Sequence, residues 1–198
     1  MTPDDVLASL LAGNRRFVGG ELTNPRRAPG DFTPLAAGQN PIAAIVGCAD
    51  SRVPPELIFD QGVGDLFVVR TAGNIIAGAG PTVNGSIEFA VAELGVSLVM
   101  VLGHSGCGAI QAAIAHIDAN DVLPGALGDL IELAMPAVAQ AQGKPGNQLA
   151  NVIAANVQRG VARLKRMAPV LADRVARGEV KVVGAVYDLT SGEVRLLS

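Results

Sequence analysis

Two short segments hold the residues of this chain whose types and spacing could do chemistry. One is Cys48-Ala-Asp-Ser-Arg52 and the other is His104-Ser-Gly-Cys107. They contain both cysteines of the chain and one of its two histidines. Two thiolates and one imidazole form a three-ligand set for zinc that leaves a fourth position open, as catalytic zinc sites usually do. These residue types therefore indicate a metal centre that can activate a water molecule.

The surrounding sequence indicates how these side chains are brought together. Residues 42–46 and 98–102 are apolar runs with the character of buried strands, and each lies just before one of the two segments. Ligands of parallel α/β sheets bind beyond the carboxyl ends of the strands. If the two strands are neighbours, Cys48, His104 and Cys107 meet at one edge of the sheet. Cys107 would also lie at the start of a helix, which lowers the pKa of a thiol.

Three other interpretations of the two segments remain open on chemistry alone. Free cysteines are often small buried hydrophobic residues without a ligand role. Residues 103–108 could cradle a phosphate between a strand and a helix, although they lack the lysine and hydroxyl residue of a P-loop. Cys48 could be the nucleophile of a cysteine phosphatase, although such a loop needs an arginine further along the chain than Arg52. Zinc is the interpretation that we favour.

Asp50 and Arg52 share a loop with Cys48. A carboxylate two residues from a metal ligand can reach either the metal or the water on it. The arginine two residues further on can hold that carboxylate in an ion pair, and Asp50 would then orient the water. The alternative, a surface ion pair worth less than ~1 kcal/mol, fits poorly with a position beside a metal centre.

The composition excludes several classes of function. The chain has 198 residues, of which 49% are apolar and 3% aromatic, which suits one domain with an aliphatic core. A net charge of −3 gives no electrostatic basis for binding nucleic acid or an anionic membrane. The acidic first residues do not resemble a secretory signal, and no apolar run approaches the ~18 residues of a membrane span. We therefore expect a cytoplasmic protein whose cysteines serve a metal or catalysis rather than a disulfide.

Apolar periodicity predicts alternating strands and helices from residue 42 onward. The expected strands are residues 42–47, 66–70, 97–103 and 180–187, with a last edge strand at 193–197. The expected helices are residues 55–60, 82–94, 106–117, 126–141, 147–167 and 169–177. Continuous apolar strands indicate that both faces of the sheet are covered. The sequence therefore predicts a single domain over residues 1–198, a three-layer α/β/α fold with a central, mostly parallel sheet of about four to five strands.

The N-terminal region has its own pattern. Thr2, Pro3 and Asp5 are typical of a helix start with a capping box, and an apolar stripe continues to about Val18. Residues 19–41 are rich in proline and glycine and should be irregular, which is long for a connection inside a compact domain. We therefore expect an N-terminal helix and arm, about residues 1–40, that packs on a partner subunit.

The paired motifs C-x-D-x-R and H-x-x-C-G resemble those of the β-class carbonic anhydrases. The resemblance is strong over about residues 39–110, and the tail from Val183 to Gly192 is similar to the closing strands of that family. It implies one Zn²⁺ per subunit, bound by Cys48, His104 and Cys107. It also implies that Asp50 and Arg52 form the catalytic dyad, and that Asp50 becomes a fourth zinc ligand only in a closed, inactive state.

The same resemblance implies further site residues and shows two departures. Gln39 corresponds to a glutamine that binds substrate across the dimer interface, and Phe67 to an apolar wall of the CO₂ pocket. Gly108 corresponds to a backbone position beside the zinc. Phe89 stands where several members have tyrosine, so a hydroxyl is missing there, and Thr71 stands where asparagine is frequent. Neither residue is expected to touch a zinc ligand.

The resemblance implies reversible hydration of carbon dioxide to bicarbonate and a proton, by attack of zinc-bound hydroxide. The enzyme is expected to be a homodimer or a dimer of dimers, with the active site near the subunit interface. One alternative is a hydrolase for CS₂ or COS on the same scaffold. Another is a non-catalytic zinc protein with a site closed by Asp50, although Arg52 argues against it. His116 is expected to be an ordinary helix-surface residue rather than a proton shuttle.

Overall fold

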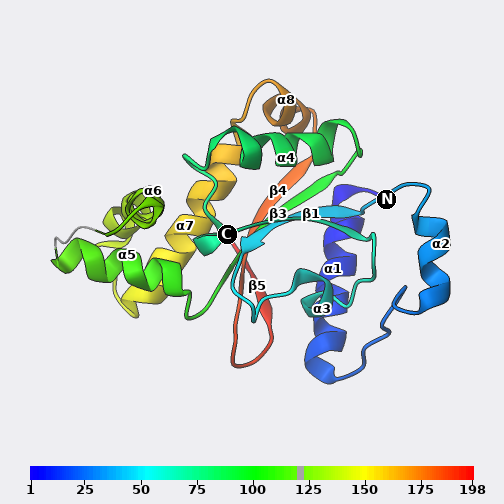
Figure 1. Ribbon diagram of the computed structural model, residues 1–198, viewed down its shortest axis with the longest axis horizontal. Helices are drawn as coiled ribbons and strands as arrows, with labels where there is room; N and C mark the ends of the chain where they lie inside the picture. The colour runs from blue at the N-terminus through cyan, green and yellow to red at the C-terminus, as the bar shows by residue number, and fades with distance from the viewer. Residues whose placement is uncertain (120–122) are drawn as a thin grey trace.

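The computed structural model describes residues 1–119 and 123–198, and its centre is a five-stranded sheet (Figure 1). The strand order is β2-β1-β3-β4-β5. The strands are β1 (Ala43–Cys48), β2 (Leu66–Thr71), β3 (Leu98–His104), β4 (Lys181–Tyr187) and β5 (Val194–Leu197). The first four run parallel, and β5 is antiparallel to β4. This arrangement confirms the predicted α/β fold with a mostly parallel sheet.

Helices cover both faces of the sheet and extend beyond it at one end. They are α1 (Pro3–Gly19), α2 (Phe32–Leu35), α3 (Pro55–Ile58), α4 (Gly80–Ala92), α5 (Gly108–Ala119), α6 (Ala126–Ala141), α7 (Gln148–Lys165) and α8 (Val170–Ala176), with 3-10 turns η1 (Pro29–Asp31) and η2 (Ala72–Asn74). Helices α4, α7 and α8 cover one face, and α1 and α3 the other. Helices α5 and α6 form a lobe at the left of the view (Figure 1). No helix in the described part of the chain is both long and apolar enough to cross a membrane.

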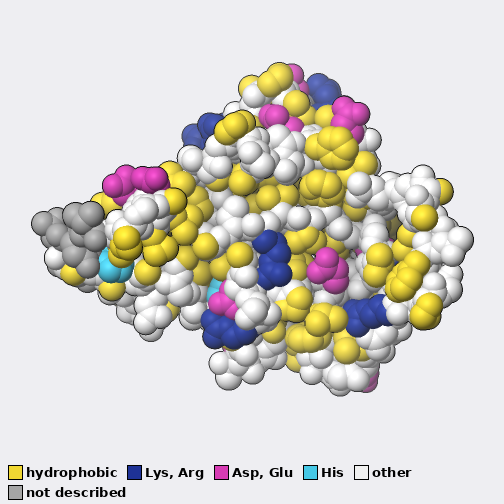
Figure 2. Space-filling model, viewed as in Figure 1, with side chains coloured by type: hydrophobic (Ala, Val, Ile, Leu, Met, Phe, Trp, Pro, Cys, Tyr) yellow, Lys and Arg dark blue, Asp and Glu magenta, His cyan; other side chains and the backbone are white. Residues whose placement is uncertain are grey.

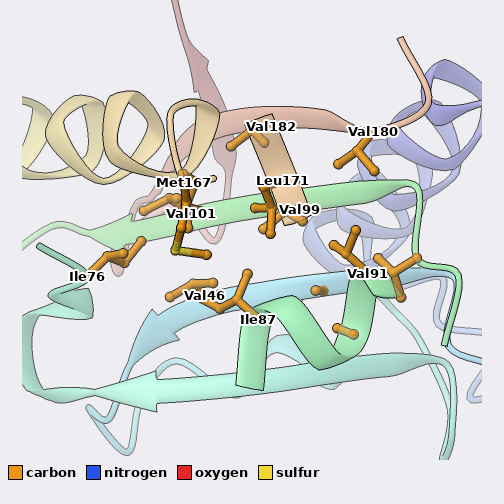
Figure 3. Packing of buried hydrophobic residues seen from close by; sticks show 14 of the residues in the cluster. Val46, Ile76, Ile87, Val91, Val99, Val101, Met167, Leu171, Val180 and Val182 are labelled. Atoms are coloured by element: carbon orange, nitrogen blue, oxygen red, sulfur yellow. The ribbon is translucent and has the colours of Figure 1, made fainter. Parts of the chain in front are cut away.

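The sheet is buried on both faces, as the continuous apolar runs predicted. Every residue of β1 and β3 is buried. Val46 and Val101 pack with Ile87 of α4 in the cluster on one face (Figure 3). Ile45 and Met100 belong to the cluster on the opposite face, beneath α1. Successive side chains of β1 and β3 therefore point to opposite faces of the sheet and contribute to two separate apolar layers. Close packing in both layers holds the backbone of these strands rigidly.

The register of β1 and β3 brings the two chemical segments together. The two strands are parallel neighbours, with Gly47 opposite Leu102. Cys48 and His104 are the last residues of their strands, so both lie at the same carboxyl edge. On the other side of β3, His104 lies opposite Tyr187 of β4. The condition on which the predicted metal site depended is therefore met by the sheet topology.

Glycines in the strands allow α7 to lie close to the sheet. A Cβ atom at Gly103 would come within 2.6 Å of Val157 Cγ2, and one at Gly184 within 2.8 Å of Val157 Cγ1. On the helix, a Cβ atom at Gly160 would lie 3.0 Å from Ile76 Cδ1. Real Cβ atoms essentially never come closer than 3.0 Å to other atoms, so larger residues at Gly103 or Gly184 would push the helix outward. The helix is thus held near the carboxyl ends of β3 and β4.

The N-terminal region differs in part from the expectation. Helix α1 begins with the predicted capping box between Thr2 and Asp5. Its apolar side packs on the sheet of the same chain through Val6, Leu7 and Leu10. The segment after it is less irregular than expected, because Pro29 starts the turn η1, Asp31 caps that turn and the short helix α2 follows. Contact of about residues 1–40 with a partner subunit stays a prediction.

Asp60 anchors the segment that follows α1. The residue is 1% exposed. Its carboxylate accepts hydrogen bonds from the Thr23 N–H at 3.0 Å and hydroxyl at 2.7 Å, from the Asn24 N–H at 3.0 Å, and from Arg16 Nε at 2.7 Å. Burial alone would raise the pKa of Asp60, but these hydrogen bonds outweigh it and hold the pKa below its usual range. The carboxylate is therefore ionised in the folded protein at neutral pH.

Asp60→Asn should lower the free energy of unfolding by about 3 kcal/mol at neutral pH, because it removes a buried charge that has several partners. The depressed pKa means that this contribution is present above the unfolded-state pKa of about 4 and is lost as the pH falls further. Urea unfolding at several pH values should show the wild type and the variant converging toward acid pH. Asp4→Asn, at an exposed carboxylate, is the control. A difference that stays constant below about pH 4 would contradict the prediction.

Candidate metal centre

Cys48, His104 and Cys107 come together as predicted. Cys48 ends β1, His104 ends β3, and Cys107 immediately precedes α5. One ligand atom of each residue lies within 4.8 Å of the other two. All three residues are buried, with exposed fractions of 4%, 0% and 1%. A soft nitrogen and sulfur donor set of this kind suits zinc, which prefers imidazole and thiolate ligands.

The separation of the two sulfurs fits one zinc ion. Cys48 Sγ and Cys107 Sγ are 4.0 Å apart, and both cysteines are free. A disulfide would need a bond of about 2.0 Å. A tetrahedral zinc ion with Zn–S bonds of about 2.3 Å needs its sulfurs about 3.8 Å apart. The sulfurs therefore lie close to the positions that zinc requires, without movement of the backbone.

His104 presents one nitrogen in the form that a metal needs. Its Nδ1 lies 2.9 Å from the carbonyl oxygen of Ser105. A carbonyl can only accept, so Nδ1 carries a proton, and in the neutral imidazole Nε2 carries the lone pair. Nε2 is buried and has no hydrogen-bond partner among the described residues. Such an orphaned buried acceptor costs free energy unless something binds it, and a metal ion would.

The two thiols are electrostatically coupled. The hydrogen bond from the Cys107 thiol lowers the pKa of Cys48 well below its usual range. The same hydrogen bond, together with burial, raises the pKa of Cys107. The backbone N–H groups of Ala109 and Ile110 oppose this rise, as expected at a helix start, but they do not outweigh it. The predicted effect of the helix start is therefore present at Cys107, but the neighbouring sulfur and burial outweigh it in the metal-free pair. The two sulfurs there share one proton, which a divalent cation would displace.

Asp50 and Arg52 form a bidentate ion pair beside the donor set. Arg52 Nε lies 2.9 Å from Asp50 Oδ1, and Arg52 Nη2 lies 2.7 Å from Oδ2. These hydrogen bonds hold the pKa of Asp50 well below its usual range. Asp50 Oδ2 lies 3.8 Å from His104 Nε2. The carboxylate therefore faces the donor set while its oxygens are engaged by arginine, and it does not belong to the group of ligand atoms.

Two further residues shape this site, and sequence reasoning missed both. Arg70, at the carboxyl end of β2, donates from Nε to the Cys48 carbonyl at 2.8 Å and from Nη2 to the Asp50 carbonyl. The Gly73 N–H donates to Cys48 Sγ at 3.2 Å. A charged residue at the end of an otherwise apolar strand was the available signal for Arg70. Gly73 gave no signal beyond its residue type, because its role depends on the conformation of η2.

Gln39 and Phe67 lie far from the donor set of their own chain. Gln39 is exposed and precedes β1, whereas Cys48 ends it. At about 3.3 Å per residue, the length of this strand puts Gln39 on the order of 20 Å from the site. Phe67 lies opposite Ala44, near the amino end of β2, and its ring is 6.2 Å from that of Phe89. These two side chains therefore do not line the donor set of their own chain.

The other positions singled out in the sequence are placed as follows. Gly108 is exposed at the start of α5, next to Cys107, with open space where a Cβ atom would lie. Thr71 lies opposite Cys48 in the sheet and accepts the Ala49 N–H through its carbonyl. His116 lies in the last turn of α5, at the end away from Cys107. The substrate role of Gly108 stays a prediction.

The fold and the site together define an α/β protein with a buried Cys-His-Cys donor set at the carboxyl edge of a mostly parallel sheet. A sequence model of the carbonic anhydrase family matches residues 43–194. "Carbonic anhydrase 2" of Mycobacterium tuberculosis is 42% identical over 95% of this chain and 89% of that protein. A carbonic anhydrase of Pseudomonas aeruginosa is 38% identical over 84% of this chain and 77% of that protein.

Solved structures agree with the sequence comparison. The β-carbonic anhydrase CcaA superposes with a TM-score of 0.77 at 28% identity, over 97% of this chain and 95% of that one. A structure from a study of two tetrameric β-carbonic anhydrases of Sordaria macrospora gives 0.76 at 26% identity, over 98% of both chains. The chain belongs to the β-class carbonic anhydrase family.

Proposed function

We propose that Cys48, His104 and Cys107 hold one zinc ion in each subunit, at which the chain hydrates carbon dioxide reversibly to bicarbonate and a proton. The observation that carries the proposal is the buried donor set itself, with its sulfurs 4.0 Å apart and the His104 Nε2 lone pair unpartnered. Three protein ligands leave one position open for water or substrate. When bound, zinc lowers the pKa of water toward about 7 and so supplies a nucleophile at neutral pH.

Asp50 and Arg52 would control that open position. Asp50 Oδ2, 3.8 Å from His104 Nε2, lies where it can accept a hydrogen bond from the attacking water. Because Arg52 keeps the carboxylate ionised, Asp50 acts only as an acceptor and fixes which way the lone pair of the water points. The bidentate ion pair with Arg52 also holds the Asp50 carboxylate away from the donor set.

The released proton is not stored on Asp50. A carboxyl group whose pKa lies far below 7 is ionised at neutral pH and does not retain a proton. The proton must therefore pass to solvent or buffer. The Arg52 side chain is 56% exposed, so the dyad lies at the boundary between the buried donors and solvent. Transfer from this boundary to buffer does not require His116.

Substrate would be enclosed by a second subunit. Gln39, which precedes β1, and Phe67, near the amino end of β2, lie at the opposite end of the sheet from the donors of their own chain. This supports a role across the interface of a homodimer or dimer of dimers. Several exposed apolar side chains lie on or next to the N-terminal arm: Leu22, Phe32, Leu57 and Val63. Figure 2 shows hydrophobic side chains over α2 at the right of the view. These surfaces support packing of the arm on a partner.

A stopped-flow assay of the zinc-loaded wild type tests this function. We expect CO₂ hydration well above the buffer rate between about pH 6.5 and 9, with one zinc per chain by metal analysis. The molar mass of the same preparation should be that of a dimer or tetramer. Turnover of CS₂ or COS without CO₂ hydration would indicate the alternative hydrolase. Bound zinc with no turnover of any of the three would contradict an enzymatic role.

A further inference from the structure

Asn156 is a buried polar residue that the proposed reaction does not use. It lies in the middle of α7, whose other buried residues are Val152, Ile153, Ala155, Val157, Gly160 and Leu164. Asn156 is 7% exposed, and its Nδ2 donates to the Gly73 carbonyl oxygen at 2.8 Å. An amide in such apolar surroundings is costly unless it is hydrogen-bonded. This hydrogen bond connects α7 to a turn that is distant in sequence. It indicates that the Asn156 side chain fixes the position of that turn.

The turn that Asn156 holds lies directly against a metal ligand. Gly73 has φ +73° and ψ 16°, the left-handed conformation, inside the turn η2 that follows β2. A Cβ atom there would also come within 3.2 Å of Ala109 Cβ. The N–H of Gly73 donates to Cys48 Sγ at 3.2 Å. Gly73 is thus fixed on both sides, with its carbonyl oxygen on Asn156 and its N–H on the ligand sulfur.

We propose that Asn156 is a positioning residue for the metal centre. It holds the Gly73 peptide so that its N–H stays on Cys48 Sγ, and this hydrogen bond reduces the charge that the thiolate gives to the metal. Two thiolates donate more charge than neutral imidazoles, so an N–H on one of them restores acidity to the metal-bound water. The proposal rests on the proposed zinc site at Cys48.

A cobalt-substituted protein tests the inference by spectroscopy. Asn156→Leu removes the donor at similar size, and Asn156→Ala does so in a smaller residue that favours helix. The matched controls are Asn151→Leu and Asn151→Ala, since Asn151 also lies on α7 and its Nδ2 donates to the Pro145 carbonyl, in the turn before the helix. The readouts are the thiolate-to-cobalt charge-transfer band, the rate of metal loss to a chelator, and the pH midpoint of CO₂ hydration by the zinc form.

Both Asn156 variants should shift the charge-transfer band to lower energy, because a thiolate without the N–H is more easily oxidised. Metal loss should accelerate roughly tenfold, because the Cys48 ligand is then less firmly positioned, and the pH midpoint should rise because the thiolate gives more charge to the metal. The Asn151 variants should match the wild type in all three readouts. If either folded Asn156 variant also matches the wild type, Asn156 has only a structural role and the inference is overturned. A wild-type cobalt protein without a thiolate band would overturn the zinc site itself.

Discussion

Replacing Cys107 with alanine should abolish both metal binding and CO₂ hydration. Cys107 is 1% exposed and supplies one of three donors, so its loss leaves a two-ligand site with the imidazole and one thiolate. The remaining Cys48 sulfur would also lose the thiol that now shares a proton with it. We expect zinc content after dialysis to fall from one per chain to a trace, and hydration to fall to the buffer rate. Metal analysis and stopped-flow assays on the same sample measure both.

Ile110→Val is the matched control for the Cys107 variant. Ile110 is 1% exposed and belongs to the same apolar cluster as Cys107 and Cys48, so the control also removes one buried heavy atom near the site. Its stability loss should be about 1 kcal/mol, with full zinc content. If Cys107→Ala kept its zinc while folded, Cys107 would not be a ligand. If Ile110→Val lost zinc as well, the effect would be one of packing.

The strands and the donor set could be predicted because they depend on local patterns. Residues 42–46 and 98–102 are apolar without interruption, and such runs are typical of a buried parallel strand. Once these two strands are placed side by side, Cys48 and His104 must meet at one edge. Cys107 follows because only two residues separate it from His104. The expected metal then follows from the donor types, two thiolates and one imidazole, and does not depend on how the surrounding side chains pack.

The supporting residues could not be predicted because each acts through a contact distant in sequence. Asn156 reaches Gly73, and Arg70 reaches the carbonyl groups of Cys48 and Asp50, across strands or layers. The sequence contains no spacing rule for such contacts. The net direction of the Cys107 pKa could not be predicted for a related reason, since the helix start was visible in the sequence but the 4.0 Å approach of the second sulfur was not.

Arg52→Ala should separate activity from metal binding. Arg52 contacts Asp50 and, at 3.4 Å, the Gly106 carbonyl, and it does not belong to the donor set, so zinc content should stay at one per chain. The hydration rate should nevertheless fall roughly 10²–10³-fold, the size of effect seen when one preorganised donor is removed from an active site. Without Arg52 the pKa of Asp50 would rise toward the ordinary value of about 4, so Asp50 would still be ionised in the assay. The loss would therefore come from misplacement of the carboxylate, which could then move onto the metal, and not from its protonation.

The control for this variant is another arginine of the same geometry. Arg177 also holds a carboxylate two residues away in a bidentate pair, at 2.6 and 3.1 Å from Glu179, and its side chain is 56% exposed, as is that of Arg52. Arg177→Ala should keep wild-type activity and zinc content, because that pair lies outside the donor set. If Arg52→Ala were as active as Arg177→Ala, the ion pair at Asp50 would be an ordinary surface pair, and Asp50 would orient water without help. If Arg52→Ala instead lost its zinc, Arg52 would act on the metal site directly. A zinc content of one per chain together with a strongly reduced rate of CO₂ hydration would identify Arg52 as the residue that keeps the fourth position of the zinc site open.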